Sequence, residues 1–273
     1  MPRRSLELFI GATFLLALIV GGWIAYQEYT KACCAFPDEP EPRPTEKLGL
    51  MTSLPIYWPL DADMEDIASG NAEMPWQRRI LESRYELVPL DTLSPIPALS
   101  PDEPDTDPLA GLERLAVIQP RGLSPADNVA LDDWVREGGQ LLLVLDPMLT
   151  GDYDAPLGDP KRPVDTALIP PVVGRWGLTI SFDPDGQYER RPLKVDEETF
   201  SIFAAITGRI EVVAPDSASC ELRAQNIVAQ CKVGAGHVTL MADATVFEVL
   251  VEPTIRPPSG DTQLGQLLRF AFP

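Results

Sequence analysis

The feature that most restricts the fold is a strand, a helix and a second strand in the middle of the sequence. Leu115 to Ile118 is a short apolar run, and a second run extends from Gln140 to Leu145. Between them, Ser124 and Pro125 provide an N-cap followed by proline at the first helical position, and Gly138-Gly139 ends the helix. The apolar stripe of this helix is Val129, Leu131, Trp134 and Val135. This spacing predicts a right-handed βαβ crossover between parallel strands.

The flanking sequence extends this unit in both directions. Because the two runs are apolar except for Gln140, both faces of the sheet should be covered by helices, which predicts a doubly wound α/β domain. Further strands are predicted at 48–54, 86–91, 178–182, 210–213, 221–233 and 237–242, and helices at 76–85, 171–176 and 264–270. Those of the C-terminal half include antiparallel additions to a mostly parallel sheet.

The segment from 220 to 231 predicts a disulfide-linked hairpin. Its two arms, 221–224 and 227–230, flank a two-residue turn at Gln225-Asn226, and this register puts Cys220 opposite Cys231. A hydrogen-bonded pair of cysteines would be strained, so the register could shift by one residue. The alternative is two small buried apolar side chains without a bond.

An uncharged apolar run near the N-terminus predicts a membrane anchor. Leu8 to Tyr26 has 19 residues, which at roughly 1.5 Å per residue nearly spans a hydrocarbon core about 30 Å thick. Arg3 and Arg4 precede the run and mainly acidic residues follow it. The positive-inside rule then keeps the N-terminus in the cytoplasm and exports the remaining chain to the periplasm or the cell exterior. A cleaved signal peptide, a lipoprotein site at Cys33 and a twin-arginine signal stay as alternatives.

Composition sets the domain organisation and excludes some partners. The chain has 41 acidic and 22 basic residues, for a formal charge of −19, which disfavours nucleic acid and anionic lipid headgroups as ligands. We therefore expect a cytoplasmic tip and transmembrane anchor at 1–30, a proline-rich acidic linker at 31–47, and one exported α/β domain at 48–273. The expected partners are membrane lipid around 8–26 and a protein of the membrane or envelope.

Four polar residues are predicted to share a ligand crevice. Ligands of open α/β sheets bind beyond the carboxyl ends of the strands, at a reversal of strand order. The residues that this geometry would bring together are Ser53, Arg121, Asp146 and Asp243. A strand-end aspartate more often caps a neighbouring turn, so the alternative is a purely structural role.

Catalytic and metal-binding motifs are scarce in the sequence. His237 is the single histidine, so no two-histidine metal site can form, and its place at the start of a strand indicates a surface or half-buried position. No Gly-x-Ser-x-Gly or Gly-x-Cys-x-Gly elbow occurs. The turn at Asp183 begins like a calcium loop, but Lys194 occupies the position that a bidentate glutamate would need. We therefore expect no cofactor, no metal and no catalytic residue.

Two segments resemble a known family. They are SPADNVALDDWVREGGQLLLVLDP at 124–147 and GAGHVTLMAD at 234–243. Together they are similar to the domain of GldG-type, uncharacterised ABC-type transport accessory proteins, which is related to class I glutamine amidotransferases. The resemblance implies an amidotransferase-like or flavodoxin-like sheet. It also implies a binding or accessory role, because members resembling this chain lack the amidotransferase nucleophile.

The sequence thus favours a membrane-anchored, non-catalytic binding or interaction module of the cell envelope, accessory to an ABC-type transport system. The alternative is a carboxylate-dependent hydrolase of an envelope substrate. Two reachable carboxyl groups about 5 to 9 Å apart would favour the hydrolase.

Overall fold

The computed structural model of the chain describes residues 46–182, 191–195, 201–248 and 260–273, which belong to the unit Pro44–Pro273. Within these ranges no helix combines the length and the apolarity needed to cross a membrane. The anchor expected at 8–26, the calcium-like turn at Asp183 and most of the linker lie outside the described residues.

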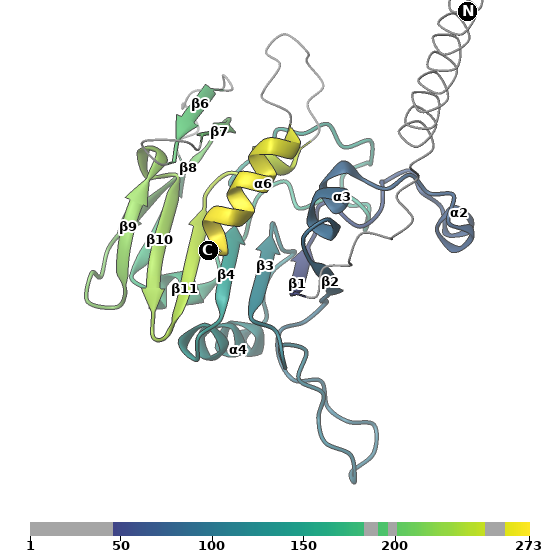
Figure 1. The fold of residues 1–273 in the computed structure, drawn as a ribbon, viewed down its shortest axis with the longest axis horizontal. Coiled ribbons are helices and arrows are strands. Elements are labelled where there is room, and N and C mark those ends of the chain that lie inside the picture. The colour runs from purple at the N-terminus through teal and green to yellow at the C-terminus, as the bar shows by residue number, and fades with distance from the viewer. Residues whose placement is uncertain (1–45, 183–190, 196–200, 249–259) are drawn as a thin grey trace, which may run out of the picture. The chain divides into compact units, whose positions relative to one another are not determined.

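A seven-stranded sheet runs through the centre of this unit in the order β2-β1-β3-β4-β11-β10-β9 (Figure 1). Its strands are β1 Lys47–Thr52, β2 Glu86–Pro89, β3 Arg114–Ile118, β4 Gln140–Val144, β9 Ser219–Arg223, β10 Val228–Val233 and β11 Gly236–Met241. The pairs from β2 to β11 are parallel, whereas β10 and β9 run antiparallel to their neighbours. The sheet is therefore mixed, and β2 forms one edge, as Pro89 predicted.

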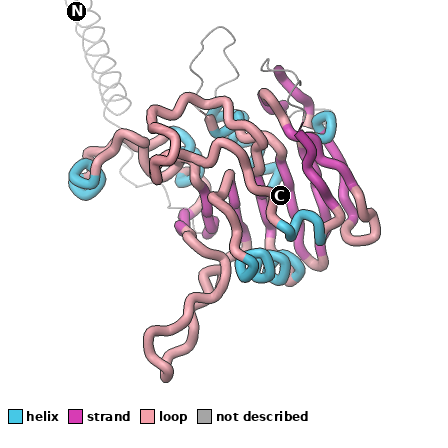
Figure 2. The backbone as a smooth tube through the Cα atoms, turned by 180° about the vertical axis from the view of Figure 1, so that it is seen from behind, coloured by secondary structure: helices cyan, strands magenta, loops and turns pink. Residues whose placement is uncertain are grey.

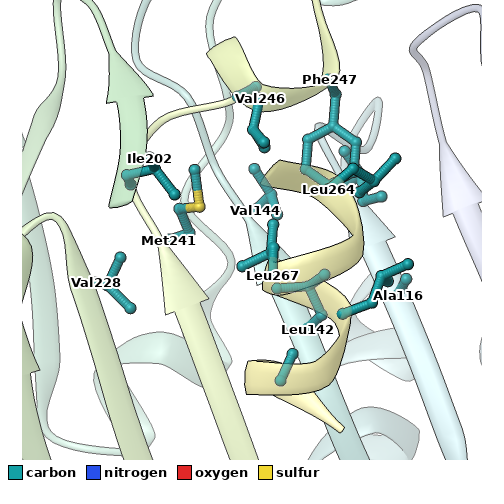
Figure 3. Close-up of a cluster of buried hydrophobic side chains, with 14 of the residues drawn as sticks. Ala116, Leu142, Val144, Ile202, Val228, Met241, Val246, Phe247, Leu264 and Leu267 are labelled. Atoms are coloured by element: carbon teal, nitrogen blue, oxygen red, sulfur yellow. The ribbon is translucent and has the colours of Figure 1, made fainter. Parts of the chain in front are cut away.

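Two apolar layers cover the faces of this sheet. On one face, α3 (Trp76–Glu82) and α6 (Gly260–Ala271) pack on side chains such as Leu142, and Figure 3 shows Leu264 and Leu267 of α6 in this layer. On the other face, α4 (Pro125–Arg136) and α5 (Pro171–Arg175) pack on alternate residues such as Leu143. Because successive strand residues point to opposite faces, the apolar runs supply both layers.

The remaining described elements lie outside this sheet. Strands β5 (Leu178–Phe182) and β8 (Gly208–Val212) form one antiparallel pair, and β6 (Arg191–Lys194) and β7 (Ser201–Ala204) form another. A short helix, α2 (Met64–Ser69), follows β1, and the 3-10 turns η1 (Ala224–Asn226) and η2 (Thr245–Phe247) follow β9 and β11. Figure 2 shows that long loops join many of these elements.

The predicted fold class, a doubly wound, mostly parallel amidotransferase-like or flavodoxin-like sheet, is wrong, and the N-terminal transmembrane helix predicted with it lies outside the described residues. The described chain forms a mixed sheet with few helices. Between β2 and β3 the chain runs through a loop without a helix, and between β4 and β11 it passes through α5 and the strands β5 to β10. Regular strand–helix alternation, which defines a doubly wound sheet, holds only locally. The βαβ unit of β3, α4 and β4 is confirmed.

One residue of the predicted apolar stripe of α4 faces solvent. Val129 is 57% exposed, whereas Asn128 and Asp132 are buried. The Asn128 side-chain oxygen accepts the N–H of Val172 at 3.1 Å, and Asp132 Oδ1 accepts the indole N–H of Trp176 at 2.8 Å. The face of α4 that packs against α5 is therefore partly polar. A search for apolar residues at helical spacing does not detect Asn128 and Asp132, which lie on this face.

The predicted disulfide is confirmed. Cys220 and Cys231 are bonded, they pair directly in the register of β9 and β10, and their Cα atoms are 4.0 Å apart. This separation is close to that of a non-hydrogen-bonded antiparallel pair, so no shift of register is needed. Gln225 and Asn226 have φ of 58° and 69°, which a two-residue hairpin turn of type I′ requires.

Candidate functional site

Three of the four predicted site residues lie at the carboxyl ends of strands β1, β4 and β11, and Gln119 links two of them, Ser53 and Asp146. Ser53 follows β1, Gln119 follows β3, Asp146 follows β4 and Asp243 follows β11. The Ser53 hydroxyl donates to the main-chain oxygen of Gln119 at 2.5 Å. The Gln119 side chain accepts the main-chain N–H of Asp146 at 2.8 Å and donates to its carbonyl at 3.0 Å. Parallel strand ends thus converge, as the sequence predicted.

Arg121 lies apart from these three residues. Its side chain is exposed, and its guanidinium donates to the carbonyl oxygens of Pro160 and Arg162. The structure therefore places Arg121 as a brace for the loop after β4. Its predicted ligand role has no support from this position.

Asp146 and Asp243 are completely buried and accept hydrogen bonds on both carboxyl oxygens. Asp146 accepts the main-chain N–H groups of Met148 at 2.8 Å and Ala244 at 2.7 Å. Asp243 accepts those of Thr245 at 2.9 Å and Ala205 at 3.0 Å. The two aspartates therefore hold the chain segments that leave β4 and β11, which is the structural role that strand-end aspartates often have.

Burial makes ionisation of both aspartates unfavourable. Loss of hydration raises the pKa of Asp146 to about 7 against the lowering effect of its main-chain hydrogen bonds, and the charge of Glu248 adds to the rise. Loss of hydration also raises the pKa of Asp243, and the charge of Asp146 raises it further. Both buried carboxyl groups therefore favour the neutral form more than an exposed aspartate does.

Glu248 is a third buried carboxylate at this edge of the sheet. Its Oε1 accepts the N–H groups of Thr150 at 2.9 Å and Gly151 at 2.6 Å and the hydroxyl of Tyr153 at 3.1 Å, while Oε2 accepts the hydroxyl of Thr150 at 2.6 Å. Glu248 therefore fixes the loop that follows β4. Glu248 could not be predicted from the sequence, because it lies beyond the 3-10 turn that follows β11 and no local pattern marks it.

A cavity of about 560 Å³ opens next to this loop. Its residues come from three segments: the loop after β1, the start of α3 and the loop held by Glu248. The lining consists of Pro55, Pro59, Leu60, Asp61, Glu73, Met74, Pro75, Trp76, Gln77, Arg79, Gly151, Asp152, Tyr153 and Asp154. The cavity therefore lies beyond the carboxyl ends of β1 and β4, on the side where sheets of this kind bind ligands.

The buried carboxylates and the cavity belong to one hydrogen-bonded assembly. Glu248 holds Gly151 and Tyr153 on one wall, and Gln77 on the other wall donates to the carbonyl of Phe247 at 2.7 Å. Phe247 is the last residue of the turn η2, whose first residue is held by Asp243, and Glu248 follows it. Both walls are thus tied to the same short segment after β11.

The lining combines apolar and acidic groups. Trp76 and Tyr153 are half-buried and offer aromatic surface, with proline, leucine and methionine side chains beside them. Four exposed carboxylates, Asp61, Glu73, Asp152 and Asp154, contribute to the lining, which has Arg79 as its single basic residue. Such a surface attracts cations electrostatically and through the faces of aromatic rings.

Two other expectations concern metals and His237. Among the described residues, no group of three or more histidine, cysteine, aspartate or glutamate side chains has a geometry for a metal ion. His237 is exposed on β11, opposite Lys232 and Gln140, at the amino end of that strand and hence at the other end of the sheet from the cavity. The sequence predicted a surface or half-buried strand histidine, and the exposed position agrees with it.

No family model matches the chain, and no curated protein matches it. Solved structures that resemble it include the exo-β-1,4-mannosidase Op5Man5 from Opitutaceae bacterium strain TAV5, with 17% identity, a TM-score of 0.44, and 84% of this chain and 35% of that chain covered. A β-galactosidase from Bacillus circulans sp. alkalophilus has 11% identity, a TM-score of 0.42, and coverage of 83% and 31%. A β-galactosidase from Rahnella sp. R3 has 11% identity, a TM-score of 0.41, and coverage of 74% and 29%. The chain thus spans about a third of these structures, and a likeness at this level assigns it neither a family nor an activity.

Proposed function

We propose that this protein is a non-catalytic binding module whose cavity takes a cationic ligand with an apolar body. The observation that carries the proposal is the lining of the cavity, where aromatic and aliphatic surface adjoins four exposed carboxylates and one arginine. A ligand ammonium group over the face of Trp76 or Tyr153 would gain about 0.5 to 2 kcal/mol, depending on its hydration. The apolar body of the ligand would cover the proline and methionine side chains.

The hydrogen bonds behind the cavity support a binding role for this site and not a catalytic role. Asp146 and Asp243 have no exposed surface, and each of their carboxyl oxygens is engaged by a main-chain N–H group. Glu248 is almost as deeply buried and holds a loop. These three carboxylates fix the walls of the cavity, so the ligand meets a preorganised surface, which reduces the entropic cost of binding.

We further propose that the module works outside the cytoplasm, held by the anchor at 8–26, with a role accessory to an ABC-type transport system. The basic residues before the apolar run and the acidic residues after it support this topology. The disulfide between Cys220 and Cys231 also supports export, because such bonds persist in oxidising compartments.

Calorimetric titration with a defined probe tests the binding function. The probe is benzyltrimethylammonium, and the matched anion is benzenesulfonate, which has a similar ring and the opposite charge. We expect the full-length protein in detergent to bind the cation and not the anion, with weaker binding when salt is raised from 20 to 300 mM. Trp76→Phe should weaken binding roughly two- to tenfold through the less favourable ring.

Charge variants complete the test. Glu73→Gln and Asp152→Asn should each weaken cation binding roughly 1.5- to fivefold, the range that exposed charge pairs give. Asp133→Asn, an exposed carboxylate of α4 outside the cavity lining, is the matched control and should leave binding unchanged. Equal binding of both probes, or equal effects of Asp152→Asn and Asp133→Asn, would refute the proposal. Turnover of an envelope glycan that Asp152→Asn abolishes would favour the alternative, a carboxylate-dependent hydrolase.

A further inference from the structure

Residues 94–108, here named the acidic arm, project from the domain between β2 and β3. Figures 1 and 2 show this segment as a long loop that extends away from the sheet. Both of its ends are anchored in the body, since Leu93 and Leu109 are buried in the apolar layer on the α4 side. The arm is therefore a fixed outgrowth of the fold and is remote in sequence from the residues that line the cavity.

The arm has a defined backbone. Ile96 and Thr106 exchange main-chain hydrogen bonds of 2.8 and 2.9 Å, and the Asp105 carboxylate accepts the N–H of Ala98 at 3.0 Å. Five prolines restrict the backbone further, at positions 95, 97, 101, 104 and 108. A segment that is ordered before binding loses less entropy when it binds.

Asp127 of α4 secures the base of the arm. Its Oδ1 accepts the Thr92 hydroxyl at 2.7 Å and the N–H groups of Leu93 at 2.8 Å and Ser94 at 3.0 Å. Burial by itself would raise the pKa of Asp127, but these bonds and the one from Ser124 outweigh it and hold the pKa well below its usual range. The carboxylate is therefore ionised at neutral pH and keeps the arm in place.

The end of the arm presents apolar surface to solvent. Leu99 is fully exposed, and Ile96 is 47% exposed. Asp102, Glu103, Asp105 and Asp107 are exposed as well, and no lysine, arginine or histidine occurs from 85 to 113. An exposed leucine on a stiff outgrowth has no stabilising role in the body of the domain, because it contributes nothing to either apolar layer.

We infer that the acidic arm docks into a partner protein that offers an apolar pocket for Leu99 and lysine or arginine residues at its rim. The charge of the arm selects this partner. A second copy of the chain is strongly acidic, with a formal charge of −19, and anionic lipid headgroups repel the arm for the same reason. A basic rim would accelerate encounter, and Leu99 would supply the buried anchor that protein interfaces need.

Site-specific photocrosslinking in cells tests this inference. A benzophenone amino acid replaces Leu99 in the full chain, and the matched control carries it at Leu157, which is 84% exposed on another loop. We expect one protein adduct from position 99 and none of that species from position 157. Peptide sequencing of the adduct should place the crosslink within a lysine- or arginine-rich surface segment.

Two further tests remove carboxylate charges from the acidic arm and titrate the chain with the purified partner. Asp102→Asn with Glu103→Gln should lower the adduct yield roughly two- to tenfold, and the purified partner should bind the wild-type chain more tightly than Leu99→Ser by a similar factor. The inference fails if position 99 gives no adduct, a lipid adduct or a crosslink to a second copy. It also fails if the yield is insensitive to the charge changes or if Leu99→Ser binds as the wild type does. None of these results depends on ligand binding in the cavity.

Discussion

Removal of the disulfide between Cys220 and Cys231 should destabilise the domain by a predictable amount. The bond closes a loop of 11 residues, and it joins β9, at the edge of the sheet, to β10. Cys231 is buried and Cys220 packs against the same apolar layer, so alanine at both positions preserves the character of the site while removing the link. The double variant Cys220→Ala with Cys231→Ala is therefore the cleanest perturbation.

The magnitude follows from the size of the loop. In the chain-entropy model, the cost of closing 11 residues in the unfolded chain is roughly 2.7 kcal/mol at 25 °C. For a domain of this size each kcal/mol lowers Tm by about 2 to 4 °C, so the variant should melt roughly 5 to 10 °C below the wild type. The small sulfur volume lost in the apolar layer adds to the effect.

Urea unfolding of the oxidised wild type, the reduced wild type and the double variant measures the effect. Reductant should lower the transition midpoint of the wild type to near that of the variant and leave the variant unchanged, which separates the link from the side-chain change. A loss under about 0.5 kcal/mol, with β9 and β10 still protected from hydrogen exchange, would refute the entropic reasoning. A wild type that is reduced as isolated from the envelope would refute the exported location as well.

Two further predictions concern the buried aspartates and a close backbone contact. Burial raises the pKa of Asp146 to about 7 and also raises the pKa of Asp243. The stabilisation that the two neutral carboxyl groups give the folded state is therefore complete below the pKa of about 3.9 in the unfolded chain, and it is lost as pH rises toward 7. Asp243→Asn should flatten the fall in unfolding free energy between pH 5 and 7, and an unchanged slope in urea titrations would contradict this. Gly236→Ala would set a Cβ 2.0 Å from the carbonyl oxygen of Val135, so it should cost roughly 3 kcal/mol or more in the same assay, whereas Gly174→Ala, with open space around it, should be neutral or slightly stabilising.

The sequence predicted the central strands well because their signal is local. A strand that is apolar on both faces, such as Leu115 to Ile118, is stable only when an apolar layer covers each face. Ser124 followed by Pro125 predicts a helix start from the local sequence alone. The same reasoning failed for Val129, since the face of α4 that meets α5 is partly polar. It failed for the fold class, because a loop without a helix between β2 and β3 leaves the local strand signals unchanged.

The candidate site was predictable only where topology alone determines position. Asp146 and Asp243 follow strands that lie next to each other in the sheet, so the sequence could bring them together. Arg121 follows the neighbouring β3, yet a long side chain can turn outward, and it braces Pro160. The cavity draws on the loop after β1, the start of α3 and the loop after β4, whose mutual position depends on Glu248 and Gln77. No spacing in the sequence encodes those two long-range contacts.

These contacts change the meaning of the strand-end aspartates. Asp243 fixes the turn after β11 by accepting a hydrogen bond from Thr245, and Asp146 binds the same segment through Ala244. Phe247 and Glu248 of this segment hold the two walls of the cavity. Removal of either aspartate should therefore disturb the cavity without any contact to a ligand. A loss of cation binding in Asp243→Asn would then report a displaced wall, and it would not identify Asp243 as a ligand-contacting residue. Asp152→Asn, which alters the lining directly, is the variant that separates the two roles.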